Sequence, residues 1–116
     1  MLLKLGKAYH DVAGENKDKE AVKKADKYLS KLLAIEPGNA PAMVYYGSVL
    51  TMKAREAFLP WEKMKYMKRG FVQMDSAVAL DPDEPEVRLI RAINSTSVPK
   101  MFNRLKMAVA DFKDVR

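Results

Sequence analysis

Apolar residues recur every three or four positions through most of the chain, a spacing that places them on one face of an α-helix. The clearest example is the segment 20–35, where lysines separate an apolar stripe made of Val22, Ala25, Tyr28, Leu29, Leu32, Leu33 and Ile35. No segment alternates apolar and polar residues with the period of two that a half-buried strand requires. The pattern therefore predicts an all-α protein.

Prolines and capping residues divide this pattern into about six helices. Glu36-Pro37-Gly38-Asn39 ends the helix over 20–35, because proline cannot continue a helix, and Asn39 can cap the next one. A first helix begins at the start of the chain, before the helix over 20–35. Beyond Asn39 the pattern predicts helices over 40–54, 62–80, 86–94 and 100–113, with a proline-containing turn before each one. Short turns between helices favour antiparallel hairpins.

A sequence pattern also occurs twice. The segments 32–39 and 77–84 each contain the end of an apolar stripe, an acidic residue, a proline and a polar cap. Leu5-Gly6 and Tyr46-Gly47 lie within the preceding helices, where glycine allows a partner helix to approach closely. The second helices carry small, large, small and proline residues at spacings of four, three and five, namely Ala25, Leu29, Leu32 and Pro37, and then Gly70, Met74, Ala77 and Pro82. Over roughly residues 1–95 the chain resembles the tetratricopeptide repeat family.

This resemblance implies antiparallel helix hairpins stacked as a short α-solenoid. The chain would be one domain with degenerate repeats over roughly 1–39, 40–84 and 85–116. The turn of the second repeat is longer than the family pattern, which predicts that the second hairpin protrudes past its neighbours. The third repeat lacks most of the landmark residues and is expected to be a terminal cap.

Composition argues against an enzyme. The 116 residues contain no cysteine and a single histidine, His10. These counts exclude disulfides and thiolate zinc sites and argue against a Ser-His-Asp triad. We therefore expect a non-catalytic protein and assign no catalytic, cofactor-binding or metal-binding residue.

The start of the chain raises two alternatives. Leu2, Leu3 and Leu5 form an apolar face, and no capping residue precedes Leu2. Either the chain is a fragment of a longer protein, or this N-terminal face meets a second copy in a homo-oligomer. Without cysteines the compartment is undecided: cytoplasmic by default, or exported if an N-terminal segment is missing.

In the resembled family, the first helix of each repeat lines a concave groove that holds a peptide or a partner helix. The resemblance implies that this groove is lined here by Leu3, Lys7, His10, Val44, Ser48, Thr51, Met52, Leu89, Ile93 and Thr96. Relatives that grip a C-terminal carboxylate use Lys and Asn at set positions, and only Lys7 suits that role here. A protein or peptide partner is the first hypothesis; the alternative is that these residues only pack against a terminal helix.

A basic segment suggests a second class of partner. The net charge is +6, and residues 53–69 hold six basic and two acidic side chains. We call its most prominent residues the basic tip: Trp61, Lys63, Lys65, Lys68 and Arg69. An aromatic ring among cations can stack on a nucleic-acid base or lie at an anionic membrane surface. The simpler interpretation, which we favour, is a solvated hairpin whose Trp packs against the turn, and a protein partner is preferred over nucleic acid or membrane.

Three other charged or titratable residues have expected positions. His10, beside Asp11, is expected at the surface or at the edge of the groove. Arg88 and Arg91 are expected in surface ion pairs, which contribute little stability. An arginine that faced inward near Asn94 would instead need several hydrogen-bond acceptors.

Overall fold

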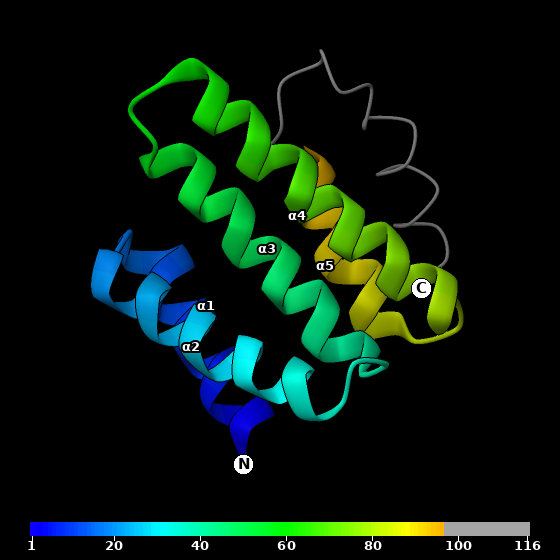
Figure 1. The fold of residues 1–116 in the computed structure, drawn as a ribbon. Helices are drawn as coiled ribbons and strands as arrows, with labels where there is room; N and C mark the ends of the chain where they lie inside the picture. Colours follow the sequence, from blue (N-terminus) through cyan, green and yellow to red (C-terminus); the bar gives the residue numbers. More distant parts are fainter. Residues whose placement is uncertain (97–116) are drawn as a thin grey trace.

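The computed structural model describes residues 1–96, and all regular structure in this range is helical (Figure 1). The helices are α1 (Leu2–Asn16), α2 (Lys19–Ile35), α3 (Ala40–Glu56), α4 (Pro60–Leu80) and α5 (Pro85–Thr96). The prediction of an all-α protein is confirmed for this part of the chain. The helix predicted over 100–113 lies outside the described residues, so a sixth helix stays a prediction.

Capping residues set the boundaries of the helices. The Asn39 side chain accepts a hydrogen bond of 3.0 Å from the backbone amide of Ala42 at the start of α3, as the sequence predicts. Asp18 does the same for α2, where it accepts from the amides of Glu20 and Ala21. No side-chain hydrogen bond caps α1, in agreement with the sequence.

Helix α3 is the centre of the fold. It contacts each of the other four helices, and Figure 1 shows it between the α1–α2 hairpin and the pair α4 and α5. Eleven of its seventeen residues are buried. A helix covered on most faces cannot carry exposed charges along its length, which explains why residues 40–52 contain no charged side chain.

Two glycines bring α3 and α4 into direct backbone contact. A Cβ atom on Gly47 would lie 2.6 Å from the carbonyl oxygen of Gly70, and one on Gly70 would lie 2.7 Å from that of Gly47. Gly6 has a similar role in α1, where a Cβ atom would lie 2.5 Å from Leu29 Cδ2 of α2. The prediction that Gly6 and Gly47 allow close helix packing is confirmed.

The core lies between the helices of both hairpins. Its largest fully buried side chains include Phe71, Leu29, Leu50 and Met74. Ala25 and Ala77, the small residues of the duplicated pattern, are also fully buried. Helix α4 is the longest of the five helices. In Figure 1 the turn between α3 and α4 extends beyond the turn between α1 and α2. None of the five helices is long and apolar enough to cross a bilayer.

Candidate binding surfaces

The structure separates the predicted groove residues into a buried set and an exposed set. The α3 residues are buried, and so is His10: the set is Val44, Ser48, Thr51, Met52 and His10. On α5, Leu89, Ile93 and Thr96 are exposed, whereas Leu3 and Lys7 of α1 are half-buried. The expectation that α3 lines an open groove is therefore wrong in this structure, because α1 and α5 both pack against α3 and cover it.

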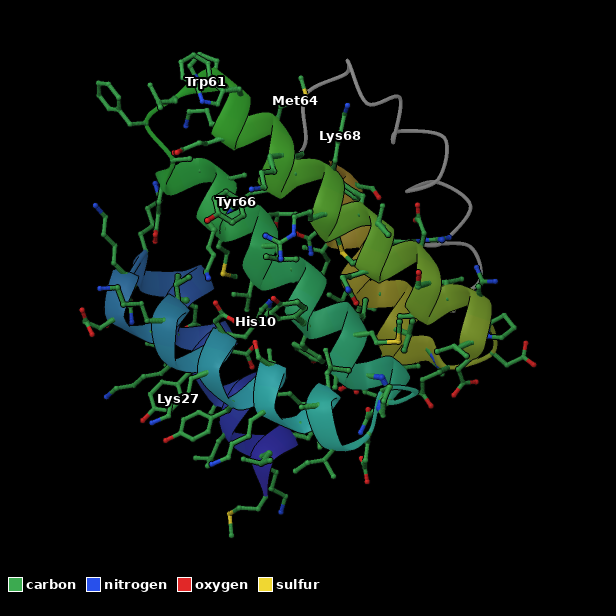
Figure 2. All side chains as sticks on the ribbon, in the orientation of Figure 1. His10, Lys27, Trp61, Met64, Tyr66 and Lys68 are labelled. Atoms are coloured by element: carbon green, nitrogen blue, oxygen red, sulfur yellow. The ribbon has the colours of Figure 1, made fainter. Side chains whose placement is uncertain are left out.

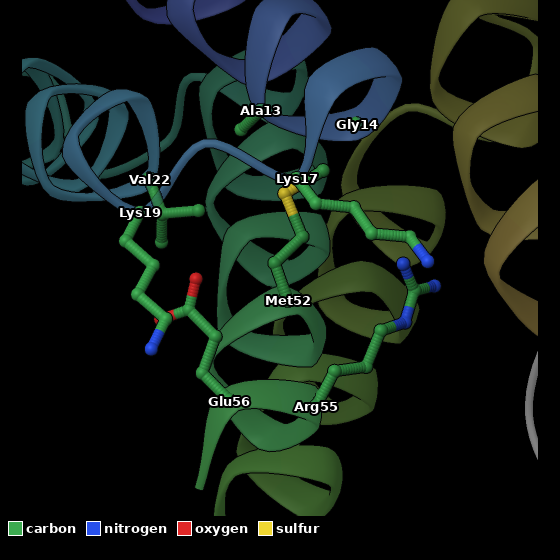
Figure 3. Close-up of a pocket in the computed structure, with 8 residues that line it drawn as sticks. All are labelled: Ala13, Gly14, Lys17, Lys19, Val22, Met52, Arg55 and Glu56. Carbon is green, nitrogen blue, oxygen red and sulfur yellow. The ribbon is translucent and has the colours of Figure 1, made fainter.

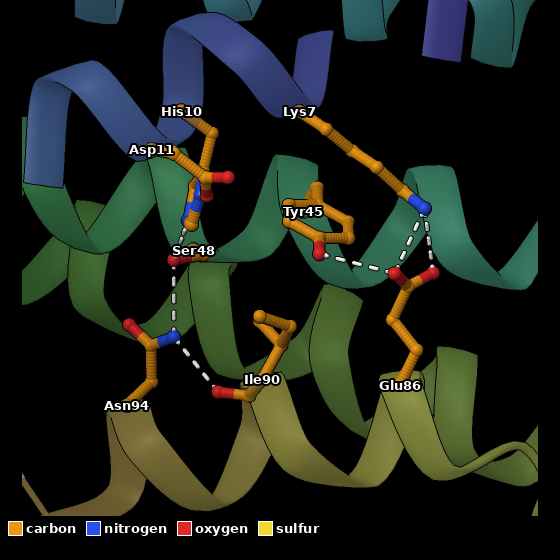
Figure 4. Close-up of polar contacts among 8 residues, drawn as sticks. All are labelled: Lys7, His10, Asp11, Tyr45, Ser48, Glu86, Ile90 and Asn94. Carbon is orange, nitrogen blue, oxygen red and sulfur yellow. Dashed lines mark hydrogen bonds and ion pairs between the residues drawn. The ribbon is translucent and has the colours of Figure 1, made fainter. Parts of the chain in front are cut away.

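In place of a groove, a buried polar cluster joins α1, α3 and α5 (Figure 4). His10 Nε2 lies 2.6 Å from Ser48 Oγ, and the Asn94 side-chain amide donates to Ser48 Oγ at 3.0 Å. Thr51 Oγ1 donates to Asn94 Oδ1 at 2.7 Å, and Asn94 Nδ2 also donates to the Ile90 carbonyl. We call His10, Ser48, Thr51 and Asn94 the polar interface. Within the described residues, no buried side-chain nitrogen or oxygen atom lacks a partner.

The hydrogen bonds fix the tautomer of His10. Its Nδ1 lies 3.0 Å from the Asp11 carboxylate, which can only accept, so Nδ1 carries the proton. Nε2 then accepts from the Ser48 hydroxyl, and the Ser48 oxygen accepts from Asn94. Burial lowers the pKa of His10, while the neighbouring Asp11 acts in the opposite direction. The prediction that His10 lies at the surface or at the edge of the groove is wrong, since the residue is buried and its ring packs edge-on against Tyr45, with the centroids 4.9 Å apart.

These contacts repeat the order of a hydrolase triad, Asp11 to His10 to Ser48. A triad, however, needs a serine that a substrate can reach. Ser48 is only 3% exposed, and its oxygen already accepts the Asn94 amide. The arrangement therefore connects three helices rather than presenting a nucleophile to a substrate.

A second polar link crosses the same face one helical turn away. Lys7 Nζ lies 2.8 Å from both carboxylate oxygens of Glu86, so α1 and α5 are joined directly. The Tyr45 hydroxyl of α3 donates to Glu86 at 3.3 Å. Burial, followed by the charge of Glu86, raises the pKa of Tyr45. Lys7, the one residue suited to a carboxylate clamp, is thus paired with a carboxylate of the same chain.

Arg91 is an inward-facing arginine. Its side chain is buried, and Nη1 lies 3.5 Å from Asp75 Oδ1 of α4. The prediction of a surface ion pair is wrong for Arg91, and the inward alternative is confirmed. Arg88 is half-buried, and its Nε donates to the Pro82 carbonyl. Arg91 faces inward because α4 packs against α5 on that side.

A cavity of about 430 Å³ lies between the α1–α2 turn and the end of α3 (Figure 3). Ala13, Gly14, Val22 and Met52 form its apolar wall, and its charged edge consists of Lys17, Lys19, Arg55 and Glu56. Met52 therefore lines this cavity instead of the predicted groove. The sequence did not indicate it, because its walls come from three helices.

The basic tip differs from the favoured interpretation. Trp61 is 68% exposed, so it does not pack against the turn, and Phe58 beside it is 92% exposed. Lys63 Nζ donates to the carbonyls of Ala54 and Arg55, and so it stabilises the end of α3. The remaining cations of the basic tip, Lys65, Lys68 and Arg69, are exposed on α4. Phe58 was not among the predicted residues, although an aromatic residue in a turn close to Pro60 and Trp61 was a signal.

The described residues contain no cluster of metal ligands, and comparison with known proteins identifies no relative. Across residues 1–96, no three His, Asp or Glu side chains lie together as metal ligands would. No protein-family model, curated protein or solved structure gives a significant match to this chain.

Proposed function

We propose that this protein is a non-catalytic interaction module of the tetratricopeptide type, in which the helix hairpins form a short solenoid that binds a peptide or a partner helix. The observation that carries the proposal is an apolar pair on α5: Leu89 is 36% exposed and Ile93 is 49% exposed. They are four residues apart, so they share one helical face. A partner helix commonly docks through apolar residues at this spacing.

The neighbouring contacts support α5 as the binding element. Asn94 anchors one end of α5 to α3, and Glu86 anchors the other end to Lys7 of α1. Glu86, Leu89 and Ile93 follow one another at spacings of three and four, so the Lys7–Glu86 pair lies at one end of the face that carries the partly exposed Leu89 and Ile93. Such a preformed face requires little reorganisation on binding, which favours affinity.

A random peptide library displayed on phage and selected on the immobilised chain tests this proposal. We expect the enriched peptides to carry apolar residues at helical spacing and to lose about tenfold or more in affinity for the double variant Leu89→Asp/Ile93→Asp. Val72→Asp is the matched control, because Val72 is also apolar and exposed but lies on α4. Equal binding to both variants would place the site elsewhere.

The alternative function is that of a serine hydrolase, with Asp11, His10 and Ser48 as its catalytic triad. A fluorophosphonate probe, which labels activated serines, separates the two classes. We expect no labelling of Ser48 in the folded protein. Labelling that disappears in Ser48→Ala would overturn the non-catalytic proposal.

A second copy of the chain is an alternative partner, through the N-terminal apolar face. Leu2 and Leu3 pack against the core, while Met1 is 92% exposed. Light scattering over a concentration series at two salt strengths tests it. A dimer at both salt strengths that Leu3→Lys dissociates would support this face, whereas a monomer throughout would exclude it.

A further inference from the structure

We propose that the α3–α4 turn is an attachment site for an acidic lipid bilayer. The site is the tip surface, which we define as Phe58, Pro60, Trp61, Met64, Lys65, Lys68 and Arg69. This inference is independent of the peptide-binding face, because the tip surface lies on other helices than Leu89 and Ile93.

With Met1, the two aromatic residues of the tip surface are the most exposed large apolar side chains in the described part of the chain. Phe58 is 92% exposed and Trp61 is 68% exposed, and only one intervening loop residue and one proline separate them. Large aromatic side chains normally bury most of their area in a folded domain. Phe58 and Trp61 are both exposed to solvent at the end of a hairpin, which indicates a surface that a binding partner covers.

The cations lie directly behind these aromatic residues. Lys65 and Lys68 follow Trp61 by four and seven residues, which places them about 6 and about 10 Å further along the helix axis. Trp61, Met64, Lys65 and Lys68 share one face of α4, and together with Pro60 and Arg69 they line a shallow hollow of about 730 Å³. Figure 2 shows Trp61, Met64 and Lys68 in this order from the turn along α4.

The two acidic residues nearest the turn do not line this hollow. Glu56 and Glu62 line a different hollow, which Tyr66 and two α2 residues also border. Lys23 and Lys53 line the same hollow, and they form ion pairs with Glu20 and Asp26 of α2. The hollow beside Trp61 is therefore lined by cations without a carboxylate, whereas the hollow beside Tyr66, over whose ring Arg69 also lies, contains both signs of charge.

This arrangement fits a bilayer better than a nucleic acid. At a membrane surface, apolar side chains enter the boundary between headgroups and acyl chains, while cations one or two helical turns behind meet anionic headgroups. Trp in particular prefers this interface. A nucleic-acid groove instead needs cations that alternate with aromatic platforms along the strand. Here all aromatic residues of the tip surface precede all of its cations.

The fluorescence of Trp61 measures binding directly, because it is the only Trp in the chain. We would titrate the protein with phosphatidylcholine vesicles with and without phosphatidylserine. We expect a blue shift only with the anionic vesicles. Phe58→Ser should weaken binding about tenfold without removing the reporter. Each cation contributes roughly fivefold, so Lys65→Gln/Lys68→Gln/Arg69→Gln should weaken it on the order of a hundredfold.

The matched control is Lys24→Gln/Lys27→Gln/Lys31→Gln on the exposed face of α2, which removes the same net charge far from the tip surface (Figure 2 labels Lys27). It should keep most of the affinity. Equal losses in both triple variants would overturn the proposal in favour of non-specific attraction. Tighter binding of single-stranded oligothymidylate than of vesicles would overturn it in favour of a nucleic-acid partner. The absence of a blue shift with anionic vesicles would also overturn it. Circular dichroism confirms that each variant is folded.

Discussion

The polar interface lies around the middle of α3 and the tip surface lies just beyond its end, and both depart from the usual distribution of residues. Around the middle of α3, Ser48 and Thr51 are buried, and around its end, Phe58 and Trp61 are exposed. Folded proteins normally bury apolar side chains and expose polar ones, so each exception requires an explanation. The first is explained by contacts within the chain, since every polar atom of the interface has a partner. For the second, the described residues provide no such internal explanation.

This difference separates stability from binding. A buried hydrogen-bonded cluster contributes mainly when it is complete, because removing one member leaves the others desolvated and unpaired. An exposed aromatic residue contributes little to folding, because its surface stays in water in both states. Substitutions at the two places should therefore differ in kind as well as in size.

The largest effect is expected at Asn94. Its amide and carbonyl oxygen bond to Ser48, Thr51 and Ile90, so Asn94→Ala breaks the polar interface at its centre. We expect the free energy of unfolding to fall by about 2–4 kcal/mol. Urea denaturation followed by circular dichroism measures it, with the exposed neighbour Ile93→Ala as the control. If both variants lose the same amount, the cluster is not cooperative.

The backbone contact of α3 and α4 offers the next test. Gly47→Ala places a methyl group against the Gly70 carbonyl and should cost about 1–3 kcal/mol. Gly14→Ala is the matched control, because a Cβ atom there would lie 3.6 Å from Met52 Cε, an ordinary contact. It should be neutral or stabilise α1 by about 0.5–1 kcal/mol. Thermal unfolding should give a lower melting temperature for Gly47→Ala and an unchanged or higher one for Gly14→Ala, and a Gly47→Ala variant as stable as the wild type would refute the close packing.

A smaller effect is expected from pH. Burial lowers the pKa of His10 below its ordinary 6.5, so below pH 6.5 the unfolded chain binds a proton that the folded chain does not. The free energy of unfolding should therefore be fully retained above pH 6.5 and decrease as the pH falls. Asp11→Asn removes the group that opposes this shift and should enlarge the decrease. Urea titrations at several pH values measure the free energy of unfolding. In His10→Gln the part of its pH dependence that is due to His10 should be absent. A pH profile of His10→Gln identical to that of the wild type would contradict this prediction.

The smallest effect on stability is expected at the tip surface. Phe58→Ser removes a side chain that is 92% exposed, so the free energy of unfolding should change by no more than about 0.5 kcal/mol. Urea denaturation beside the wild type measures it. A loss comparable with that of Asn94→Ala would mean that Phe58 supports the fold and would remove the contrast between the two regions.

Local signals in the sequence predicted much of the fold. Asn39 and the prolines marked helix boundaries, and Gly6 and Gly47 marked close contacts, because caps and small residues act within one or two helices. The burial of Ser48 and Thr51 was not predicted, since it depends on α1 and α5 packing on either side of α3. The charge-free segment 40–52 was the available signal. The exposure of Trp61 was also missed, because sequence does not show whether a turn folds back on its helix.

Hydrogen exchange measured by mass spectrometry, with and without anionic vesicles, tests the contrast between the two regions most directly. The account predicts slow exchange in the middle of α3 under both conditions, because its backbone amides are hydrogen-bonded within a buried helix. It predicts faster exchange over residues 57–69 in the free protein and protection of that segment when vesicles are added. Rapid exchange around Ser48, or protection by vesicles anywhere but the tip surface, would contradict it.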